Sequence, residues 1–90
     1  MTHRPFHRPL GTRLVEIVGL VKLSSRKALQ FAIVEENGVR LGEILHVGLT
    51  PSGRPTIPER PQRMVMAEPV AARIVEAAAG IGVKLREARS

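Results

Sequence analysis

The dipeptide Asn37-Gly38 constrains the fold of this chain more than any other feature. Both residues tolerate the positive φ angles of a type I′ turn, and apolar-rich runs flank them, which together form the strongest short-range signal for a β-hairpin. The run before the turn alternates two sets of side chains, Leu29, Phe31 and Ile33 on one side and Gln30, Ala32 and Val34 on the other. The sequence therefore predicts two antiparallel strands joined at this dipeptide.

The segment 25–37 also fits a helix. Ser25 is a suitable N-cap for a helix through RKALQFAIVEE, and Gly38 is a suitable C-terminal stop. The turn signal favours the strand, but the sequence alone leaves both readings open.

The strand expected after the turn covers residues 39–49, VRLGEILHVGL. One side carries Val39, Leu41, Leu45, Val47 and Leu49, and the other carries Arg40, Ile44 and His46. Glu43 interrupts the apolar side. Gly42 and Gly48 within this strand predict a bulge, a strong bend, or the close approach of another backbone or a ligand.

Two further strands complete the expected sheet. Residues 14–23, LVEIVGLVKL, are rich in β-branched side chains and predict a strand buried on one face and partly on the other, followed by a polar turn at 24–27. The proline-rich segment 50–61 is expected to be an irregular loop, because proline removes the donors that a central strand needs. QRMVMA over 62–67 then predicts a short fourth strand.

A helix is expected to begin at Glu68-Pro69, since proline suits the first helical position and a carboxylate suits the positive end of the helix dipole. The helix is expected to run to about Ala79 and to end at Gly80. Its apolar stripe consists of Val70, Ala71, Ile74, Val75 and Ala78, with Arg73 and Glu76 facing outward. Residues 81–85 fit either a short last strand or an extension that packs on a partner subunit.

The sequence thus predicts an α+β fold, an antiparallel four-stranded sheet followed by one C-terminal helix (ββββα). A chain of 90 residues closes a single core, which we place at 14–82, between a flexible basic arm at 1–13 and a C-terminal tail at 83–90. The only aromatic residues are Phe6 and Phe31, so aliphatic side chains must fill the core. A core of this kind is marginal in a monomer, and a homodimer is expected.

The formal net charge of +6 and a pI near 11.4 indicate a polyanionic partner, such as nucleic acid or an anionic membrane surface. The chain contains no cysteine, which excludes disulfides and cysteine-based zinc sites. No apolar run approaches the length of a membrane span, and the first residues lack the apolar region of a secretory signal. A cytoplasmic protein without membrane association is the default expectation.

No arrangement of residues in the sequence matches a catalytic site. His3 and His7 lie in the basic arm without an ordered carboxylate or cysteine to complete a metal site. No motif places a serine, threonine or carboxylate beside His46, and the glycines form no phosphate-binding fingerprint. We therefore expect a protein that is not an enzyme, with no cofactor and no small-molecule substrate.

The basic residues are unevenly spread. Residues 1–27 carry Arg4, Arg8, Arg13, Lys22, Arg26 and Lys27 against the single Glu16, and a second basic group, Arg54, Arg60 and Arg63, follows at 54–63. If the 24–27 turn and the 54–63 loop bracket one sheet face, phosphates can lie between them; a scatter of solubilising charges is the competing reading. The candidate nucleic-acid-binding residues from this distribution are Lys22, Arg26, Lys27, Arg54, Arg60 and Arg63, together with the aromatic Phe31. Phe31 is either a stacking platform or a core residue.

The order of these parts resembles the PUR repeat of Pur-alpha-like nucleic-acid-binding proteins. The basic turn 25–27, a strand containing Phe31, the Glu-Asn-Gly hairpin, a long third strand, a variable loop, a short strand beginning at Arg63 and an amphipathic helix follow in the same sequence. The unit is also similar to that of Whirly and positive-cofactor-type transcription coactivators. The resemblance covers about residues 14–82 and implies a homodimer that binds single strands across its sheet. By position, it also implies nucleic-acid contacts at Arg26, Lys27, Gln30 and Arg40. The second strand here carries one aromatic residue, where the PUR family has several.

The leading functional hypothesis is nucleic-acid binding with a preference for single-stranded DNA or RNA, in which Arg and Lys hold phosphates and bases meet the open sheet face. The alternative is a protein-interaction or assembly module that does not bind nucleic acid. A duplex reader that uses the helix ranks below both, because Arg73 is the only cation within its expected length.

Overall fold

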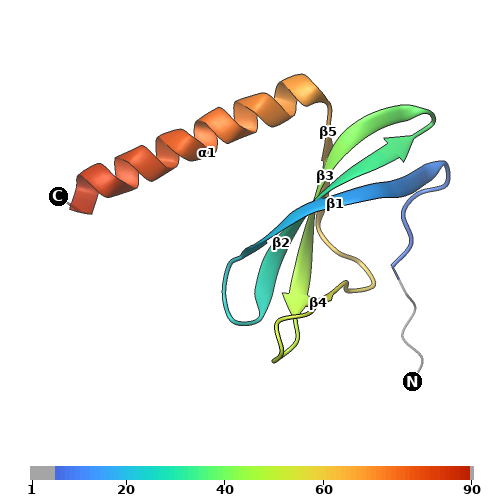
Figure 1. The fold of residues 1–90 in the computed structure, drawn as a ribbon, viewed down its shortest axis with the longest axis horizontal. Helices are drawn as coiled ribbons and strands as arrows, with labels where there is room; N and C mark the ends of the chain where they lie inside the picture. The colour runs from blue at the N-terminus through green and yellow to red at the C-terminus, as the bar shows by residue number, and fades with distance from the viewer. Residues whose placement is uncertain (1–5, 90) are drawn as a thin grey trace.

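The fold is described for residues 6–89 in a computed structural model (Figure 1). The expectations for His3 and Arg4 of the basic arm lie outside these residues. The α+β prediction is confirmed: four antiparallel strands, with the two-residue β4 as a fifth, form a curled half-barrel sheet that is followed by one C-terminal helix. The elements are β1 (Thr12–Lys22), β2 (Lys27–Glu36), β3 (Val39–Leu49), the two-residue β4 (Pro55–Thr56), β5 (Arg63–Met66) and α1 (Glu68–Arg89).

The sheet has the strand order β1-β2-β3, and β3 carries two short strands along its other side. β4 pairs with the end of β3 at Gly48, and β5 pairs with its middle from Gly42 to Leu45. A Cβ atom at Gly42 would lie 3.7 Å from the backbone carbonyl oxygen of Met66, and one at Gly48 would lie 3.7 Å from the backbone carbonyl oxygen of Thr56. Of the alternatives left open for these glycines, close approach of another backbone is therefore correct at both.

The hairpin at Asn37-Gly38 is confirmed. Asn37 and Gly38 have φ angles of 51° and 84°, as the two central residues of a type I′ turn require. β2 and β3 pair in continuous register from this turn to Lys27 opposite Gly48. The helical alternative for segment 25–37 is therefore wrong, because the turn and the cross-strand hydrogen bonds of β2 use this backbone in extended form.

One face of the sheet holds the core, and we call it the inner face. It is formed by Ala28, Gln30, Ala32 and Val34 of β2 together with Glu43, Leu45 and Val47 of β3, all of them buried. Phe6 and Leu49 pack against this core. The opposite, outer face carries Leu29, Phe31 and Ile33 of β2 with Ile44 and His46 of β3, which are half-buried.

The described part of the expected flexible arm lies against the sheet. Phe6 packs on the inner-face core, and Arg8 forms an ion pair with Glu43. The backbone N–H of Thr12 donates to the carbonyl of Pro9 at 3.1 Å, and that of Asn37 donates to the carbonyl of Gly11 at 3.1 Å. These contacts attach the segment before β1 to the core and to the β2–β3 turn.

β1 is the edge of the sheet, and most of its aliphatic side chains are exposed, including Ile17, Val18 and Leu20. The sequence predicts burial on one face, which is not what the strand shows. The physical reason is the position of α1, which contacts mainly β3 and projects away from the sheet, so that most of β1 is left uncovered. Register shifts between Leu14 and Glu16 and between Ile17 and Gly19 add local twist to this edge.

α1 continues past Gly80 to Arg89, so the predicted end at Gly80 is wrong, as are the strand alternative for residues 81–85 and the tail expected from residue 83. A glycine inside a helix costs only about 1 kcal/mol relative to alanine, and the helix-forming residues around Gly80 and Gly82 offset this cost. None of the side chains of α1 is buried, and Figure 1 shows the helix projecting away from the sheet. Within the described residues, no helix combines the length and apolar character that crossing a bilayer requires.

Candidate nucleic-acid interface

Two turns bring basic side chains together at one end of the sheet. The β1–β2 turn follows Lys22, and the β3–β4 turn follows Leu49. The backbone N–H of Leu49 donates to the carbonyl of Arg26 at 2.8 Å, and that of Thr50 donates to the carbonyl of Arg54 at 2.9 Å. The first bond places the two turns side by side, and the second closes the β3–β4 turn. We call the group Lys22, Arg26, Lys27 and Arg54 the basic end.

Short-range hydrogen bonds hold each turn in place. In the first turn, the N–H groups of Leu23 and Ser24 both donate to the carbonyl of Lys27, at 2.8 and 3.1 Å. In the second, the hydroxyl of Thr50 accepts the N–H of Arg54 at 3.0 Å, and Gly53 takes a φ of 85° that suits glycine. The backbone of both turns is therefore ordered, while the basic side chains that they carry are exposed.

The cations of the basic end have no carboxylate partner in the described part of the chain, whereas other cations of the protein do. Arg8 and Arg63 pair with Glu43, Arg13 pairs with Glu35, and Lys84 pairs with Glu87. Glu35 and Glu36 lie at the far end of β2, next to the hairpin turn. An uncompensated positive potential is therefore expected at the basic end.

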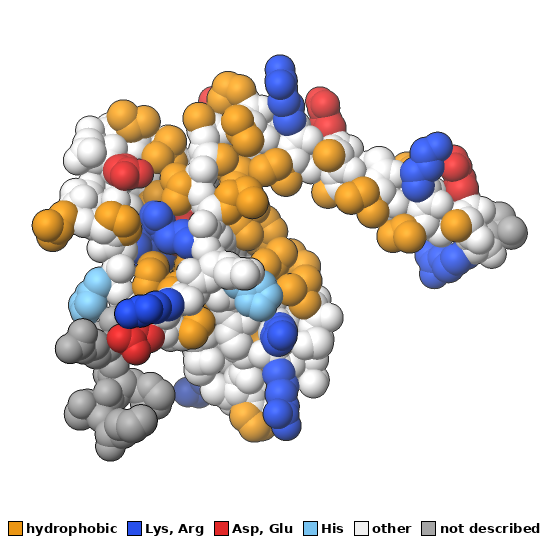
Figure 2. Space-filling view, turned by 180° about the vertical axis from the view of Figure 1, so that it is seen from behind, with side chains coloured by type: hydrophobic (Ala, Val, Ile, Leu, Met, Phe, Trp, Pro, Cys, Tyr) orange, Lys and Arg blue, Asp and Glu red, His pale blue; other side chains and the backbone are white. Residues whose placement is uncertain are grey.

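An open hollow of about 430 Å³ lies between the two turns and is lined by Ser25, Arg26, Leu49 and Pro51. Basic side chains gather at the lower right of Figure 2, where the β1–β2 turn lies in that view. A hollow with an arginine in its wall, next to further cations, can accept an anionic group such as a phosphate.

The outer face begins at the basic end and continues toward the middle of the sheet. Lys27, Leu29 and Phe31 follow one another along it on β2, and His46 of β3 lies opposite Leu29. Gly19 of β1 lies opposite Phe31, and nothing lies within 4 Å of where its Cβ would be. Phe31 is therefore a half-buried outer-face residue beside a position without a side chain, and not part of the inner-face core.

The structure does not bring every candidate residue to this place. Gln30 lies on the inner face and is 4% exposed. Arg63 is held by Glu43. Arg40 is exposed beside the hairpin turn, at the opposite end of the sheet, and Arg60 is exposed in the loop between β4 and β5. The candidates that share one region are Lys22, Arg26, Lys27 and Arg54, with Phe31 on the adjoining outer face.

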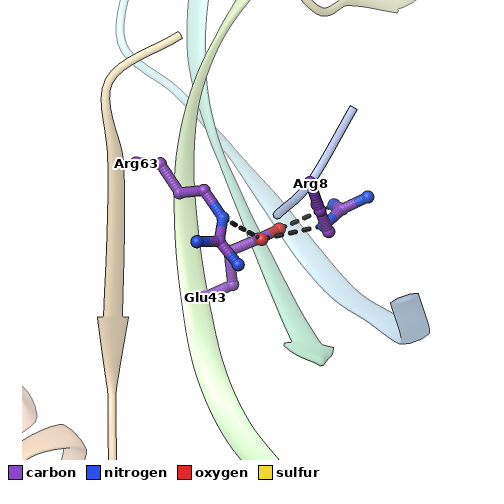
Figure 3. A network of polar contacts seen from close by, with 3 residues as sticks. All are labelled: Arg8, Glu43 and Arg63. Carbon is purple, nitrogen blue, oxygen red and sulfur yellow. Dashed lines mark hydrogen bonds and ion pairs between the residues drawn. The ribbon is translucent and has the colours of Figure 1, made fainter. Parts of the chain in front are cut away.

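Glu43 holds two arginines that come from distant parts of the sequence (Figure 3). Arg8 donates from Nε and Nη2 to the two carboxylate oxygens at 2.9 and 2.7 Å, and Arg63 donates from Nε at 2.6 Å. The side chain of Glu43 is 0% exposed. Burial alone would raise the pKa of Glu43, but the hydrogen bonds and positive charges of Arg8 and Arg63 hold this pKa below its usual value.

This cluster ties the segment before β1 and strand β5 to the centre of β3. The sequence carries one signal for it, because Glu43 occupies a position in line with Leu45 and Val47 on the side expected to be buried. A carboxylate in such a place needs a cationic partner. Nothing in the sequence identifies which of the many arginines supply it.

Residues 6–89 contain no group of three or more histidine or acidic side chains that could hold a metal ion. Comparison of the chain with protein-family models, with curated proteins and with solved structures finds no match. The geometry of the basic end and the outer face is therefore the basis for assigning a function to this protein.

Proposed function

We propose that this protein binds nucleic acid, with a preference for single strands, through the basic end and the adjoining outer face. The observation that carries the proposal is the contrast among the cations. Arg8, Arg13 and Arg63 have carboxylate partners inside the protein, while the basic end gathers exposed cations without one among the described residues.

Phosphates account for the affinity in this proposal. Lys22, Arg26, Lys27 and Arg54 extend from two adjacent turns, and their side chains can each neutralise a phosphate of a flexible strand. Release of condensed counterions then favours binding and makes it sensitive to salt. The acidic pair Glu35 and Glu36 at the far end of β2 orients the strand toward the basic end.

Bases account for the preference for single strands. Phe31 and His46 present rings on the outer face next to Lys27, and unstacked bases can lie against such rings without sequence preference. The bases of a duplex are stacked on one another and do not reach a sheet face in this way. The helix offers no comparable reading surface in its first half, where Arg73 is the only cation.

The test is a fluorescence-anisotropy titration of the full chain with labelled single-stranded and duplex oligonucleotides of equal length. Binding is measured at about 50 and 200 mM salt, the range in which phosphate contacts change affinity strongly. We expect the single strand to bind more tightly than the duplex and the affinity to fall as salt rises. The variant R26A/K27A should lose about tenfold in affinity, and its log–log salt slope should be smaller by about 1.4, near 0.7 for each lost contact.

The matched control is R40A/R73A, which removes the same charge from exposed positions outside the basic end. It should bind almost as the unmodified chain does. Equal losses in the two double variants would show a diffuse charge effect and contradict the proposed site. No binding at low salt would contradict nucleic-acid binding itself and favour the alternative, a protein-interaction module that uses the exposed apolar side chains of β1 and α1.

A further inference from the structure

The helix α1 carries an apolar stripe that extends beyond the part of the helix lying next to the sheet. Its members are alternately three and four residues apart, and they are Ala71, Ile74, Ala78, Ile81 and Leu85. This spacing is the seven-residue repeat that keeps one side of a helix against another helix. The stripe runs through Gly80 and continues almost to the end of α1 at Arg89.

The sheet covers only the start of this stripe. Ala71 and Ile74 are half-buried, but Ile81 and Leu85 are 62% and 61% exposed. Figure 2 shows hydrophobic side chains along one side of the projecting helix, beyond its junction with the sheet. The second half of the stripe has no partner within the described residues.

The dimensions of the chain agree with a missing partner. Its accessible surface is 7292 Å², whereas a compact monomer of its mass exposes about 5,200 Å². Its radius of gyration is 15.3 Å, against about 12 Å for a compact chain of this length. The excess surface, about 2,100 Å², is more than the roughly 800 Å² that each side of a stable protein interface buries.

We infer that a second copy of this chain occupies the stripe, and that the two α1 helices pack antiparallel with their crossing point near Ala78. This inference goes beyond the proposed function and does not depend on it. The antiparallel direction follows from charge. It brings Glu68 of one copy near Arg89 of the other, whereas a parallel pair would gather Lys84 and Arg89 of both copies at one end.

The space beside the start of α1 fits the same arrangement. A hollow of about 190 Å³ lies between the outer face and the helix and is lined mainly by Phe31, Ile33, Ile44, Met66, Ala71 and Ile74. In an antiparallel pair centred near Ala78, Leu85 of one copy lies beside Ala71 and Ile74 of the other. An exposed leucine of each copy thus packs on the helix side of this hollow, against Ala71 and Ile74 of its partner, which removes apolar surface of both copies from water.

The first test measures the mass of the full chain in solution by sedimentation equilibrium. The unmodified chain, 9.8 kDa as a monomer, should sediment as a dimer at micromolar concentration. I81D should sediment as a monomer. V83D is the matched control, since Val83 is 48% exposed on the opposite side of the same helix, and it should remain a dimer. Monomeric unmodified protein, or dimers in both variants, would overturn the inference.

The second test determines the direction of the helices and uses the absence of native cysteine. In the antiparallel pair, A71C mixed with L85C should form an intermolecular disulfide under mild oxidation, and each variant alone should form little. L85C that readily cross-links to itself would show a parallel pair and overturn the antiparallel arrangement.

Discussion

The cluster around Glu43 and the basic end both contain arginine, and they use it in opposite ways. At Glu43, Arg8 and Arg63 close on one fully buried carboxylate, with contacts of 2.6 to 2.9 Å. At the basic end, Arg26 and Arg54 extend from two turns into solvent without a carboxylate partner in the described chain. The first arrangement joins segments of the fold to one another, and the second leaves positive charge available to a partner.

The contrast shows why a net charge of +6 cannot by itself locate a binding site. Part of the positive charge is neutralised inside the protein, and the sequence does not distinguish that part from the rest. Arg63 illustrates this, because it belongs to the basic group 54–63 in the sequence but contacts Glu43 in the structure. If this contrast is correct, substitutions in the Glu43 cluster should lower stability, and substitutions in the basic end should weaken nucleic-acid binding.

The largest expected effect is on stability, from E43Q. The substitution leaves Arg8 and Arg63, which are mostly buried, without a counter-charge and should lower the free energy of unfolding by about 3 kcal/mol. The control E35Q removes the exposed pair with Arg13 and should change it by no more than about 0.5 kcal/mol. Urea unfolding followed by circular dichroism measures both. Similar effects of the two substitutions would mean that the Glu43 cluster does not hold the fold together.

The same cluster should make the protein sensitive to acid. The pKa of Glu43 is lower in the folded protein than in the unfolded chain, so its ionised form stabilises the fold above the ordinary glutamate pKa of about 4.3. This stabilisation is lost as the pH falls through the folded-state pKa. Urea midpoints measured from pH 7 down to about pH 3 should therefore converge for the unmodified chain and E43Q. A constant difference across this range would contradict the assignment.

The two phenylalanines should differ as the two groups of arginines do, with Phe31 contributing to binding and Phe6 to stability. F31L removes an outer-face ring and should weaken single-strand binding by about 1 kcal/mol, or roughly fivefold. F6L changes a side chain that packs on the inner-face core, and it should lower stability by about 1 kcal/mol while affinity stays unchanged. Anisotropy titration and urea unfolding of both variants provide the comparison. If F31L binds normally, bases do not stack on this ring.

The smallest expected effect is that of R26A/K27A on stability. Since these side chains are exposed and form no ion pair among the described residues, their loss should change the free energy of unfolding by less than about 0.5 kcal/mol. Urea unfolding measures this on the same samples used for binding. A loss comparable to that of E43Q would give the basic end a structural role and remove the distinction between the two regions.

The elements of the fold could largely be predicted from local signals. Asn37-Gly38 specifies its turn through the φ angles of two adjacent residues, and Glu68-Pro69 specifies a helix start in the same local way. The end of α1 was not predictable from Gly80, because Gly80 and Gly82 together destabilise the helix less than the surrounding residues stabilise it. The exposure of β1 was not predictable either, since it depends on where α1 lies.

The candidate site was predictable only in part, for a related reason. Lys22, Arg26 and Lys27 belong to one turn, so their proximity follows from the sequence. Arg54 joins them through a hydrogen bond between Leu49 and Arg26 that no local pattern indicates. Arg63 is not available as a nucleic-acid contact because it pairs with Glu43, as Arg8 does, and pairs over such long sequence separations are not visible in the sequence.

The most direct test of the central claim is a ¹H–¹⁵N correlation spectrum of the full chain recorded during titration with a short single-stranded oligonucleotide. The account predicts that the largest shift changes fall on residues 22–27, 46–48 and 50–54 and on Phe31, while the hairpin end around Arg40 stays unchanged. Changes centred on the hairpin end or on α1, or spread evenly over the spectrum, would contradict binding at the basic end.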